Sequence, residues 1–375
     1  MTARAESSDA SDASDASGAS ADFSAYTYRL PRARIALTPA RPRSAARLLV
    51  LPPPESGEAL DDRRIADLPQ ILRAGDMLVV NDTQVLPHYL PLTRQSGGRV
   101  ALTLIAPLPE LDTKPESKTV RWRAFLRPAR KVKIGETLQF GRIALTLVSR
   151  QGREAVVEFA CSSARLAAAL KRHGQMPLPP YIASRRAPAA QDRKDYQTMF
   201  ARAPGALAAP TAGLHFTPAL CRTLRARGIE FFALRLHVGV GTFAPLTQAQ
   251  WRQKKLAAEW GELSADMAAA LNRGRAEGRR LIAVGTTSLR LLESAADKSG
   301  RLSPFCGTTD LMIAPGRRCR ASDGLLTNFH LPRSSLFVLV CAYGGTARLK
   351  AAYAHAIRQN YRFYSYGDAC LIAPC

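Results

Sequence analysis

The sequence predicts an α/β fold in which a small β-barrel domain is inserted into a main α/β domain. Between residues 76 and 155, short apolar segments follow one another at close spacing without a helical pattern, which is typical of a small barrel or sandwich. After this stretch, capped helical segments alternate with short apolar strands, as in α/β proteins. We therefore assign residues 26–75 and 156–375 to the α/β domain and residues 76–155 to the barrel.

The individual elements follow from apolar patterning and helix caps. In the predicted barrel domain, strands are expected at 77–80, 99–105, 122–126, 142–148 and 154–159. In the remainder, we expect helices after Ser162 or Ser163, after Thr217, after Ser264, from Thr287 and at 346–360, and strands at 231–236, 281–284 and 336–343.

The charge balance favours a polyanionic partner. The chain has 375 residues, with 53 Lys and Arg against 30 Asp and Glu, a formal net charge of +23. Such an excess attracts polyanions, with nucleic acid as the first candidate partner and an acidic membrane surface as the second, and a bias of the genome toward arginine is the alternative explanation. Residues 1–25 contain three Asp-Ala-Ser repeats and little to bury, so we expect a disordered tail.

Several classes of protein are disfavoured. No segment has the roughly 18 apolar residues of a membrane-spanning helix, and the N-terminus has no apolar export signal. The seven cysteines form no C-x-x-C pair, so we expect reduced thiols, no zinc site and a cytoplasmic protein. The histidines lack metal-ligand spacing, so we expect no metal.

Small-residue turns beside regular elements mark candidate binding segments. Glycines let a ligand approach the backbone, and a helix N-terminus rich in hydroxyl groups suits a carboxylate. Ordinary turn chemistry and helix capping are the alternative explanation for each segment alone. The candidate groups are Thr211, Gly213 and His215 in 209–217, His237, Gly239, Gly241 and Thr242 in 237–243, Thr286, Thr287 and Arg290 in 284–290, Asn328 and His330 in 327–332, and Tyr366 and Asp368 in 364–368.

Two further patterns bear on chemistry and on nucleic acid. His215, His237 and His330 are candidate general acids or bases, because imidazole titrates near neutral pH. Basic residues are densest in 121–133, within the predicted barrel, where a solvated strand face is the alternative. With the net charge in view, we predict an RNA-binding track that comprises Arg121, Arg123, Arg127, Arg130 and Lys131, with Arg362 among the C-terminal aromatic residues.

Taken together and in order, these segments resemble the S-adenosylmethionine:tRNA ribosyltransferase-isomerase family of queuosine biosynthesis. The resemblance runs from Tyr28 to about Ile372. Its strongest pieces are 176–182, 209–217, 237–243, 283–290, 327–332 and 361–368, and weaker pieces are 80–83 and 126–131.

The resemblance implies transfer and isomerisation of the ribosyl group of S-adenosylmethionine onto 7-aminomethyl-7-deazaguanine in tRNA, giving epoxyqueuosine. S-adenosylmethionine is then a substrate, tRNA is the partner, no cofactor is required, and we expect a monomer. His215, His237, Glu259, His330 and Asp368 are expected to be catalytic. The residues expected to bind substrate are Thr211, Gly213, Gly239, Gly241, Thr242, Thr286, Thr287, Arg290, Asn328 and Tyr366.

Six positions depart from the family pattern. Gln84 replaces an arginine, Ala101 replaces an acid, and Lys254 and Ala257 replace two histidines of a His-x-x-His-x-Glu segment that retains Glu259. Near the start, Ser44 stands where an acid is usual and Ala46 where a serine is usual. Two alternatives therefore stay open beside the family reaction: a diverged enzyme that uses S-adenosylmethionine on another acceptor, and a non-catalytic RNA-binding homologue.

Overall fold

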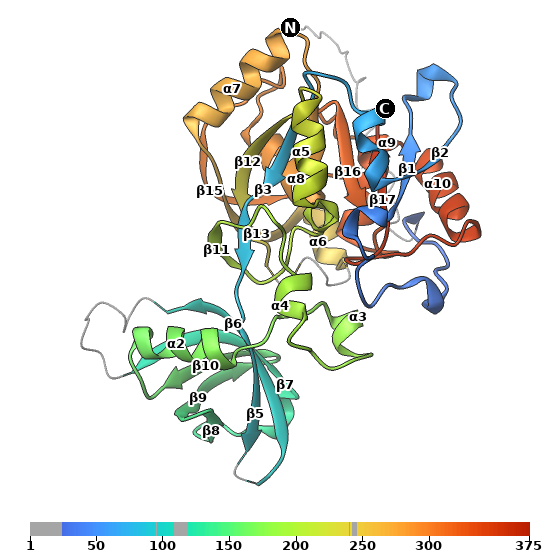
Figure 1. The fold of residues 1–375 in the computed structure, drawn as a ribbon. Coiled ribbons are helices and arrows are strands. Elements are labelled where there is room, and N and C mark those ends of the chain that lie inside the picture. Colours follow the sequence, from blue (N-terminus) through green and yellow to red (C-terminus); the bar gives the residue numbers. More distant parts are fainter. Residues whose placement is uncertain (1–24, 95, 109–118, 240, 242–245) are drawn as a thin grey trace, which may run out of the picture.

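The computed structural model describes residues 25–94, 96–108, 119–239, 241 and 246–375. Apart from Ala25, the predicted N-terminal tail lies outside these residues. The fold consists of a large α/β body and a smaller barrel, which lies at the bottom of Figure 1. The predicted fold class is confirmed.

The α/β body is organised around a mixed sheet of nine of the described strands. Central strand β3 (Met77–Asn81) pairs in parallel with β12 (Glu230–Leu236) and β14 (Leu281–Val284), and β14 pairs in parallel with β16 (Gly324–Asn328). The order across the sheet is β15 (Phe305–Leu311), β13 (Lys255–Leu263), β12 (Glu230–Leu236), β3 (Met77–Asn81), β14 (Leu281–Val284), β16 (Gly324–Asn328), β17 (Ala369–Ile372), β1 (Arg47–Leu51) and β2 (Asp61–Arg64). A separate pair joins β4 (Thr83–Val85) to β11 (Ala203–Ala206).

Several of the described helices begin where the sequence provides caps. Ser162, Thr217 and Ser264 each accept a hydrogen bond from the amide three residues later, which satisfies an otherwise unpaired N–H. The helices are α1 (Leu68–Ile71), α2 (Ser163–His173), α3 (Pro180–Ala183), α4 (Asp192–Asp195), α5 (Pro218–Ala226), α6 (Gln248–Gln253), α7 (Ala265–Ala276), α8 (Thr286–Ala295), α9 (Ser335–Gly344) and α10 (Thr346–Arg358), and η8 (Thr211–His215) is a 3₁₀ turn.

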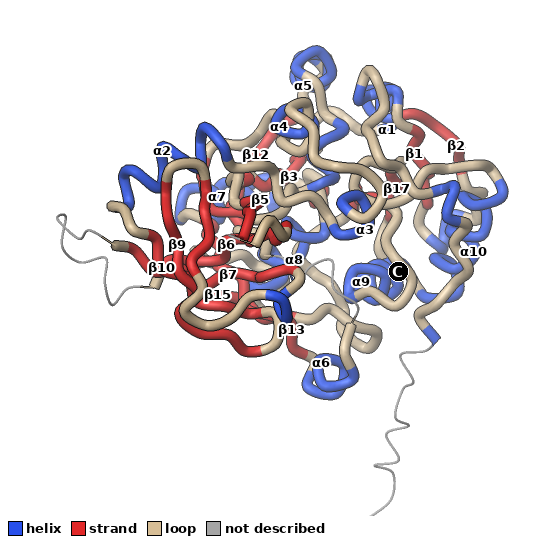
Figure 2. Tube along the Cα trace, turned by 90° about the horizontal axis from the view of Figure 1, so that it is seen from below, coloured by secondary structure: helices blue, strands red, loops and turns tan. Residues whose placement is uncertain are grey.

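The barrel is closed and antiparallel. Its order is β10 (Glu154–Phe159), β7 (Val120–Arg127), β6 (Arg99–Pro107), β5 (Tyr89–Arg94), β8 (Thr137–Phe140) and β9 (Ile143–Gln151). Alternate residues of these strands fill the interior, and Leu166 and Leu170 of α2 pack against the same core. In the view from below, β9 and β10 lie on the side of the molecule opposite to α10 (Figure 2). Closure removes exposed strand edges.

The structure corrects three predictions about these elements. Strand 77–80 is β3 of the large sheet, not part of the barrel, whose strands run from Tyr89 to Phe159. The predicted boundaries at residues 76 and 155 therefore lie outside the barrel at one end and inside β10 at the other. Two barrel strands, β5 and β8, were not predicted.

The third correction concerns residues 336–343, which form helix α9 and not a strand. Eight of the ten residues of α9 are buried, so the segment is apolar on nearly all sides. A helix that is buried all round lacks a polar stripe, and its sequence cannot be distinguished from a buried strand by periodicity. In the described part of the chain, no helix is long and apolar enough to cross a membrane.

Candidate active site

A cavity of about 290 Å³ lies between the barrel and the α/β body. Its volume is near the lower end of the roughly 300–1,000 Å³ typical of small-molecule sites. The barrel contributes Ile105, Arg123, Phe125 and Glu154, and the body contributes Leu207, Gly239, Gly241, Leu246, Gln250, Leu256, Ala257, Ala258, Glu259, Arg290, Ser335 and Leu336. Five of the predicted site residues thus meet in one cavity: Arg123, Gly239, Gly241, Glu259 and Arg290.

The body side of the cavity contains a buried ion pair. Nη1 of Arg290, on α8, donates to Oε2 of Glu259, on β13, and both side chains are less than a tenth exposed. The other carboxylate oxygen, Oε1, accepts from the Gly239 amide at 2.7 Å. The glycine-rich segment after β12 is therefore fastened to β13 by the same carboxylate that neutralises Arg290.

Arg290 has one donor group left over. Its Nε donates to the Leu311 carbonyl at 3.1 Å, whereas Nη2 is buried and has no hydrogen-bond partner within the described residues. A buried donor without a partner costs about 1–3 kcal/mol, so this group favours an acceptor supplied by a ligand.

The barrel side of the cavity presents a second Arg–Glu pair. Glu154 on β10 lies opposite Phe125 on β7, which places both on the outer face of the barrel. Nη2 of Arg123, two residues before Phe125, is 3.5 Å from Oε2 of Glu154, and both side chains are half exposed. An aromatic ring and two opposite charges thus face the buried pair across the cavity.

A small cavity of about 40 Å³ adjoins the first, and Leu336 lines both. Thr211, Asn328 and His330 also line it, so the predicted segments 209–217 and 327–332 meet here. The Thr211 hydroxyl donates to Oδ1 of Asn328 at 2.9 Å, and Nδ2 of Asn328 donates to Nε2 of His215 at 3.1 Å. The two segments are therefore linked through Asn328.

The three candidate histidines differ in burial. Burial, followed by the nearby Arg362 and Arg43, lowers the pKa of His215 to about 3, and burial lowers the pKa of His330 to about 3. His237 is half-buried, and its pKa is lowered, first by burial and then by Arg235.

Hydrogen bonds hold two of these rings in place. Nδ1 of His237 is 2.7 Å from the Thr83 hydroxyl, and the ring stacks on Trp260 with centroids 5.2 Å apart. Nε2 of His330 is 3.0 Å from the Thr327 hydroxyl. At neutral pH, the low pKa values make His215 and His330 neutral hydrogen-bonding groups.

Other predicted residues lie outside the two cavities. Asp368 accepts from the amides of Arg47 and Arg362 at 3.0 and 2.7 Å, so its carboxylate fixes the chain where the C-terminal segment meets β1. Tyr366 is buried, its hydroxyl has no hydrogen-bond partner among the residues that the structure describes, and burial raises its pKa.

At the start of α8, where the sequence predicted a carboxylate site, the threonines are buried and one of their hydroxyl groups is hydrogen-bonded within the protein. Thr286 and Thr287 are buried, and the Thr287 hydroxyl accepts from Nδ2 of Asn81 at 3.3 Å. At Gly213, a Cβ would lie 3.0 Å from Thr198, so this glycine allows close packing of η8. Thr242 lies outside the described residues.

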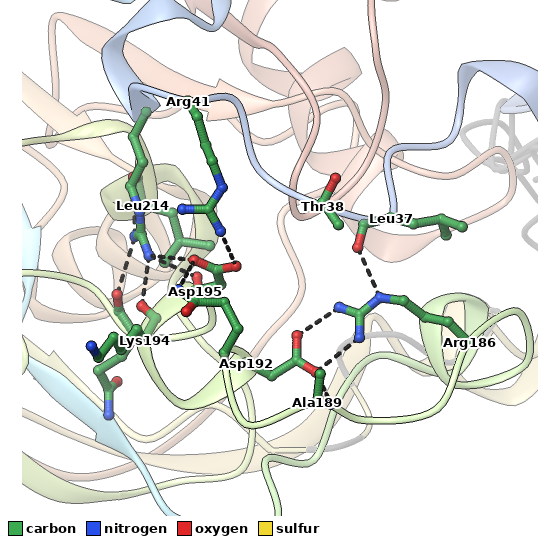
Figure 3. Close-up of polar contacts among 12 residues, drawn as sticks. Leu37, Thr38, Arg41, Arg186, Ala189, Asp192, Lys194, Asp195 and Leu214 are labelled. Carbon is green, nitrogen blue, oxygen red and sulfur yellow. Dashed lines mark hydrogen bonds and ion pairs between the residues drawn. The ribbon is translucent and has the colours of Figure 1, made fainter.

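A network of arginines and aspartates connects the N-terminal segment to residues 186–197 and to η8 (Figure 3). Arg41 and Asp195 form an ion pair of 2.8 Å, and Arg186 makes two hydrogen bonds to Asp192 while its Nε donates to the Leu37 carbonyl. Arg43 donates to the carbonyl groups of Lys194, Asp195, Gln197 and Leu214. The network ties the N-terminal segment to η8, which carries Thr211 and His215.

The predicted RNA-binding residues divide by location. Arg121 is ion-paired with Glu158 at 2.6 Å, Arg123 lines the cavity, and Arg127, Arg130 and Lys131 are exposed on the barrel. Arg362 lies on the body, where it donates to the Thr38 carbonyl.

Four of the positions that depart from the family pattern lie in different parts of the fold. Ala257 lines the large cavity beside Glu259. Nζ of Lys254 lies over the Trp251 ring, 3.4 Å from its centroid, and burial lowers its pKa. Gln84 is on β4, and Ala101 is on barrel strand β6.

Sequence reasoning missed Phe125, Glu154 and Ser335 as cavity residues and assigned Arg123 only to RNA. Nothing in the local pattern distinguishes Glu154 from Glu158, because both alternate outward on one strand. The described residues contain no group of three or more His, Cys, Asp or Glu side chains placed to hold a metal ion.

Comparison with known proteins decides the family. The profile described as "Queuosine biosynthesis protein" matches residues 23–372. The chain belongs to this family. It is 52% identical over 351 residues to the S-adenosylmethionine:tRNA ribosyltransferase-isomerase of Parvibaculum lavamentivorans, covering 93% of this chain and 98% of that protein. It is 51% identical over 358 residues to the protein of the same name from Methylocella silvestris, covering 93% and 97%.

A solved structure agrees with the architecture. The crystal structure of S-adenosylmethionine tRNA ribosyltransferase from Thermotoga maritima aligns with a TM-score of 0.52 at 29% identity, covering 93% of this chain and 99% of that one. The resemblance inferred from the sequence is confirmed, and the protein belongs to a family of enzymes.

Proposed function

We propose that this enzyme transfers the ribosyl group of S-adenosylmethionine to 7-aminomethyl-7-deazaguanine at the wobble position of tRNA and isomerises it to epoxyqueuosine, releasing adenine and methionine. The names of relatives about 50% identical over most of the chain support this reaction. The structural observation that carries the proposal is the two-domain cavity lined by Arg290, whose buried Nη2 has no hydrogen-bond partner within the described residues.

Arg290 is our candidate for the methionine carboxylate of S-adenosylmethionine. A carboxylate at Nη2 would give the buried donor its missing partner, and charge-assisted hydrogen bonds of this kind are strong. Glu259 would keep Arg290 oriented from the other side. The carboxylate site thereby moves from the start of α8, predicted from the sequence, to the side chain one turn further along.

Proton transfer needs a group that changes charge near neutral pH. The reaction requires a base for the acidic proton beside the sulfonium and an acid that assists adenine. With pKa values of about 3, His215 and His330 suit hydrogen bonding to substrate more than protonation. His237 is half-buried and lies two residues before the cavity-lining Gly239, and it is our candidate for the base although it is not itself among the lining residues.

The tRNA partner is assigned to the barrel. The exposure of Arg127, Arg130 and Lys131 supports this assignment, in which they would contact backbone phosphates while the nucleotide to be modified enters the cavity between the domains. We further propose that S-adenosylmethionine is the only small molecule required, that the protein acts as a monomer, and that it works in the cytoplasm with its tRNA substrate.

The direct test is incubation with S-adenosylmethionine and tRNA that carries 7-aminomethyl-7-deazaguanine, followed by nucleoside mass spectrometry. We expect epoxyqueuosine together with equimolar adenine and methionine. A product on a different nucleoside would support the diverged-acceptor alternative. Binding of tRNA without any product would support the non-catalytic alternative.

A further inference from the structure

The large cavity is lined by two carboxylates from different domains, Glu259 of the body and Glu154 of the barrel. Both oxygens of Glu259 are engaged, one by the Gly239 amide and one by Arg290. Within the described residues, the carboxylate of Glu154 has one ion-pair partner, Arg123, at 3.5 Å in a half-exposed setting. Exposed pairs of this kind are worth at most about 1 kcal/mol, so Glu154 can exchange its partner easily.

The two substrates place different demands on these carboxylates. The proposed acceptor carries a primary amine, which is protonated at neutral pH in the way that a lysine side chain is. An ammonium group that leaves water for a cavity requires an anionic partner. The acceptor base also requires a surface on which to stack, and Phe125 lies directly opposite Glu154 across the β7–β10 pair.

We propose that Glu154 is the specificity-determining residue for the acceptor, and that its carboxylate binds the ammonium of the aminomethyl group while Phe125 supports the base. This subsite rests on the proposed function, because it takes the acceptor from that reaction. It gives the barrel a role in choosing the nucleotide in addition to holding tRNA.

Glu158 provides a matched control on the same strand. Glu154 and Glu158 lie on the outer face of β10, and each is ion-paired with an arginine of β7. Glu154 lines the cavity, whereas Glu158 is not among its lining residues. Neutralising either residue removes one negative charge from the barrel, so general changes in tRNA affinity should be similar.

The experiment compares the dissociation constants of two tRNAs that differ only at the wobble base, one with 7-aminomethyl-7-deazaguanine and one with guanine. Wild type should prefer the first. Glu154→Gln should reduce this preference about tenfold, as expected for a charge-assisted hydrogen bond, while Glu158→Gln keeps it. Affinity for S-adenosylmethionine should not change in either variant, and Glu154→Asp should recover part of the preference.

Two outcomes would overturn the proposal alone. One is a wild-type enzyme that makes epoxyqueuosine while Glu154→Gln retains the full preference. The other is loss of S-adenosylmethionine affinity in Glu154→Gln, which would assign the carboxylate to the methionine ammonium. If wild type neither prefers the modified tRNA nor forms product, the proposed function fails together with this subsite.

Discussion

The cavity is bordered by two Arg–Glu pairs that differ mainly in their exposure to water. In the α/β body, the side chains of Arg290 and Glu259 are 4% and 7% exposed, whereas on the barrel those of Arg123 and Glu154 are 50% and 55% exposed. A buried pair is rigid because either partner alone would be an uncompensated charge. An exposed pair is weak and readily rearranged. The same two residue types therefore form a rigid surface on the body side of the cavity, where we propose that S-adenosylmethionine binds. On the barrel side, where we propose that the tRNA nucleotide binds, they form a surface that can rearrange.

The largest effect on stability is expected when the buried Arg290–Glu259 ion pair is broken. Arg290→Met should lower the free energy of unfolding by about 3–5 kcal/mol, because Glu259 would remain buried without its counter-charge. Arg123→Met on the barrel should cost less than about 1 kcal/mol. Urea denaturation of both variants measures the difference, and similar losses would contradict the distinction between the two pairs.

The buried side of the site should also impose a pH dependence on stability. His215 and His330 have pKa values of about 3 in the folded protein, against 6.5 for the ordinary side chain. Between these values the unfolded chain binds protons that the folded chain does not, so stability rises with pH up to about 6.5 and falls on acidification. Each histidine should contribute about 1.4 kcal/mol per pH unit well below pH 6.5.

Unfolding free energies between pH 7 and pH 5 provide this test. His215→Gln and His330→Gln should each make the decline shallower, whatever their effect on stability at pH 7. A variant of the surface-exposed His173 should leave the decline unchanged. If removing a buried histidine steepened the decline, that histidine would be protonated in the folded state, contrary to our account.

A substitution at Ala257 can introduce an imidazole on the body side of the cavity. The resemblance implies a histidine here, and Ala257 lines the cavity beside Glu259. General acid–base assistance is typically worth about 10²–10⁴ in rate, so Ala257→His should raise the single-turnover rate by at least about tenfold. Lys254→His should change the rate less than about twofold, because Lys254 lies on Trp251. A gain from Lys254→His alone would show that this description of the segment is wrong.

The smallest effect concerns exposed basic residues of the barrel that lie outside the cavity. Replacing Arg130 and Lys131 by serine should weaken tRNA binding several-fold and reduce the slope of log affinity against log salt by about 0.7–0.9 for each phosphate that is no longer neutralised. Replacing the exposed Arg222 and Arg225 of α5 removes the same charge from the body and should leave the slope nearly unchanged. Filter binding at several salt concentrations measures the slope for both variants. Equal changes in slope would contradict the assignment of tRNA binding to the barrel.

Local signals in the sequence were enough to predict much of the fold. The caps Ser162, Thr217 and Ser264 and the strands predicted at 231–236 and 281–284 depend on neighbouring residues alone, and the structure contains them. Strand β5 contains Pro91, which weakens a strand pattern, and its pairing with β6 and β8 is a matter of barrel closure. Helix α9 is apolar on nearly all sides, so only its tertiary surroundings identify it as a helix.

The sequence predicted site residues that belong to recognisable segments of the body. It did not predict the residues that line the cavity only because the two domains meet there. Glu259 and Arg290 came from the family resemblance and from a strand-to-helix turn, and the structure brings them into one ion pair. Glu154 and Phe125 gain their place from strand register in the barrel and from how the barrel meets the body. No local pattern encodes that arrangement.

The central claim is that both substrates meet in the cavity between the domains, and calorimetric titration of S-adenosylmethionine into Ala257→Trp tests it most directly. Ala257 is exposed on β13 and lines the cavity, so an indole there should occupy the space without disturbing the core. Lys255→Trp, on the same strand but not among the cavity residues, is the control. We predict at least about a hundredfold weaker binding in Ala257→Trp, equivalent to about 2.7 kcal/mol, and wild-type binding in Lys255→Trp. Wild-type affinity in a folded Ala257→Trp protein would contradict the account.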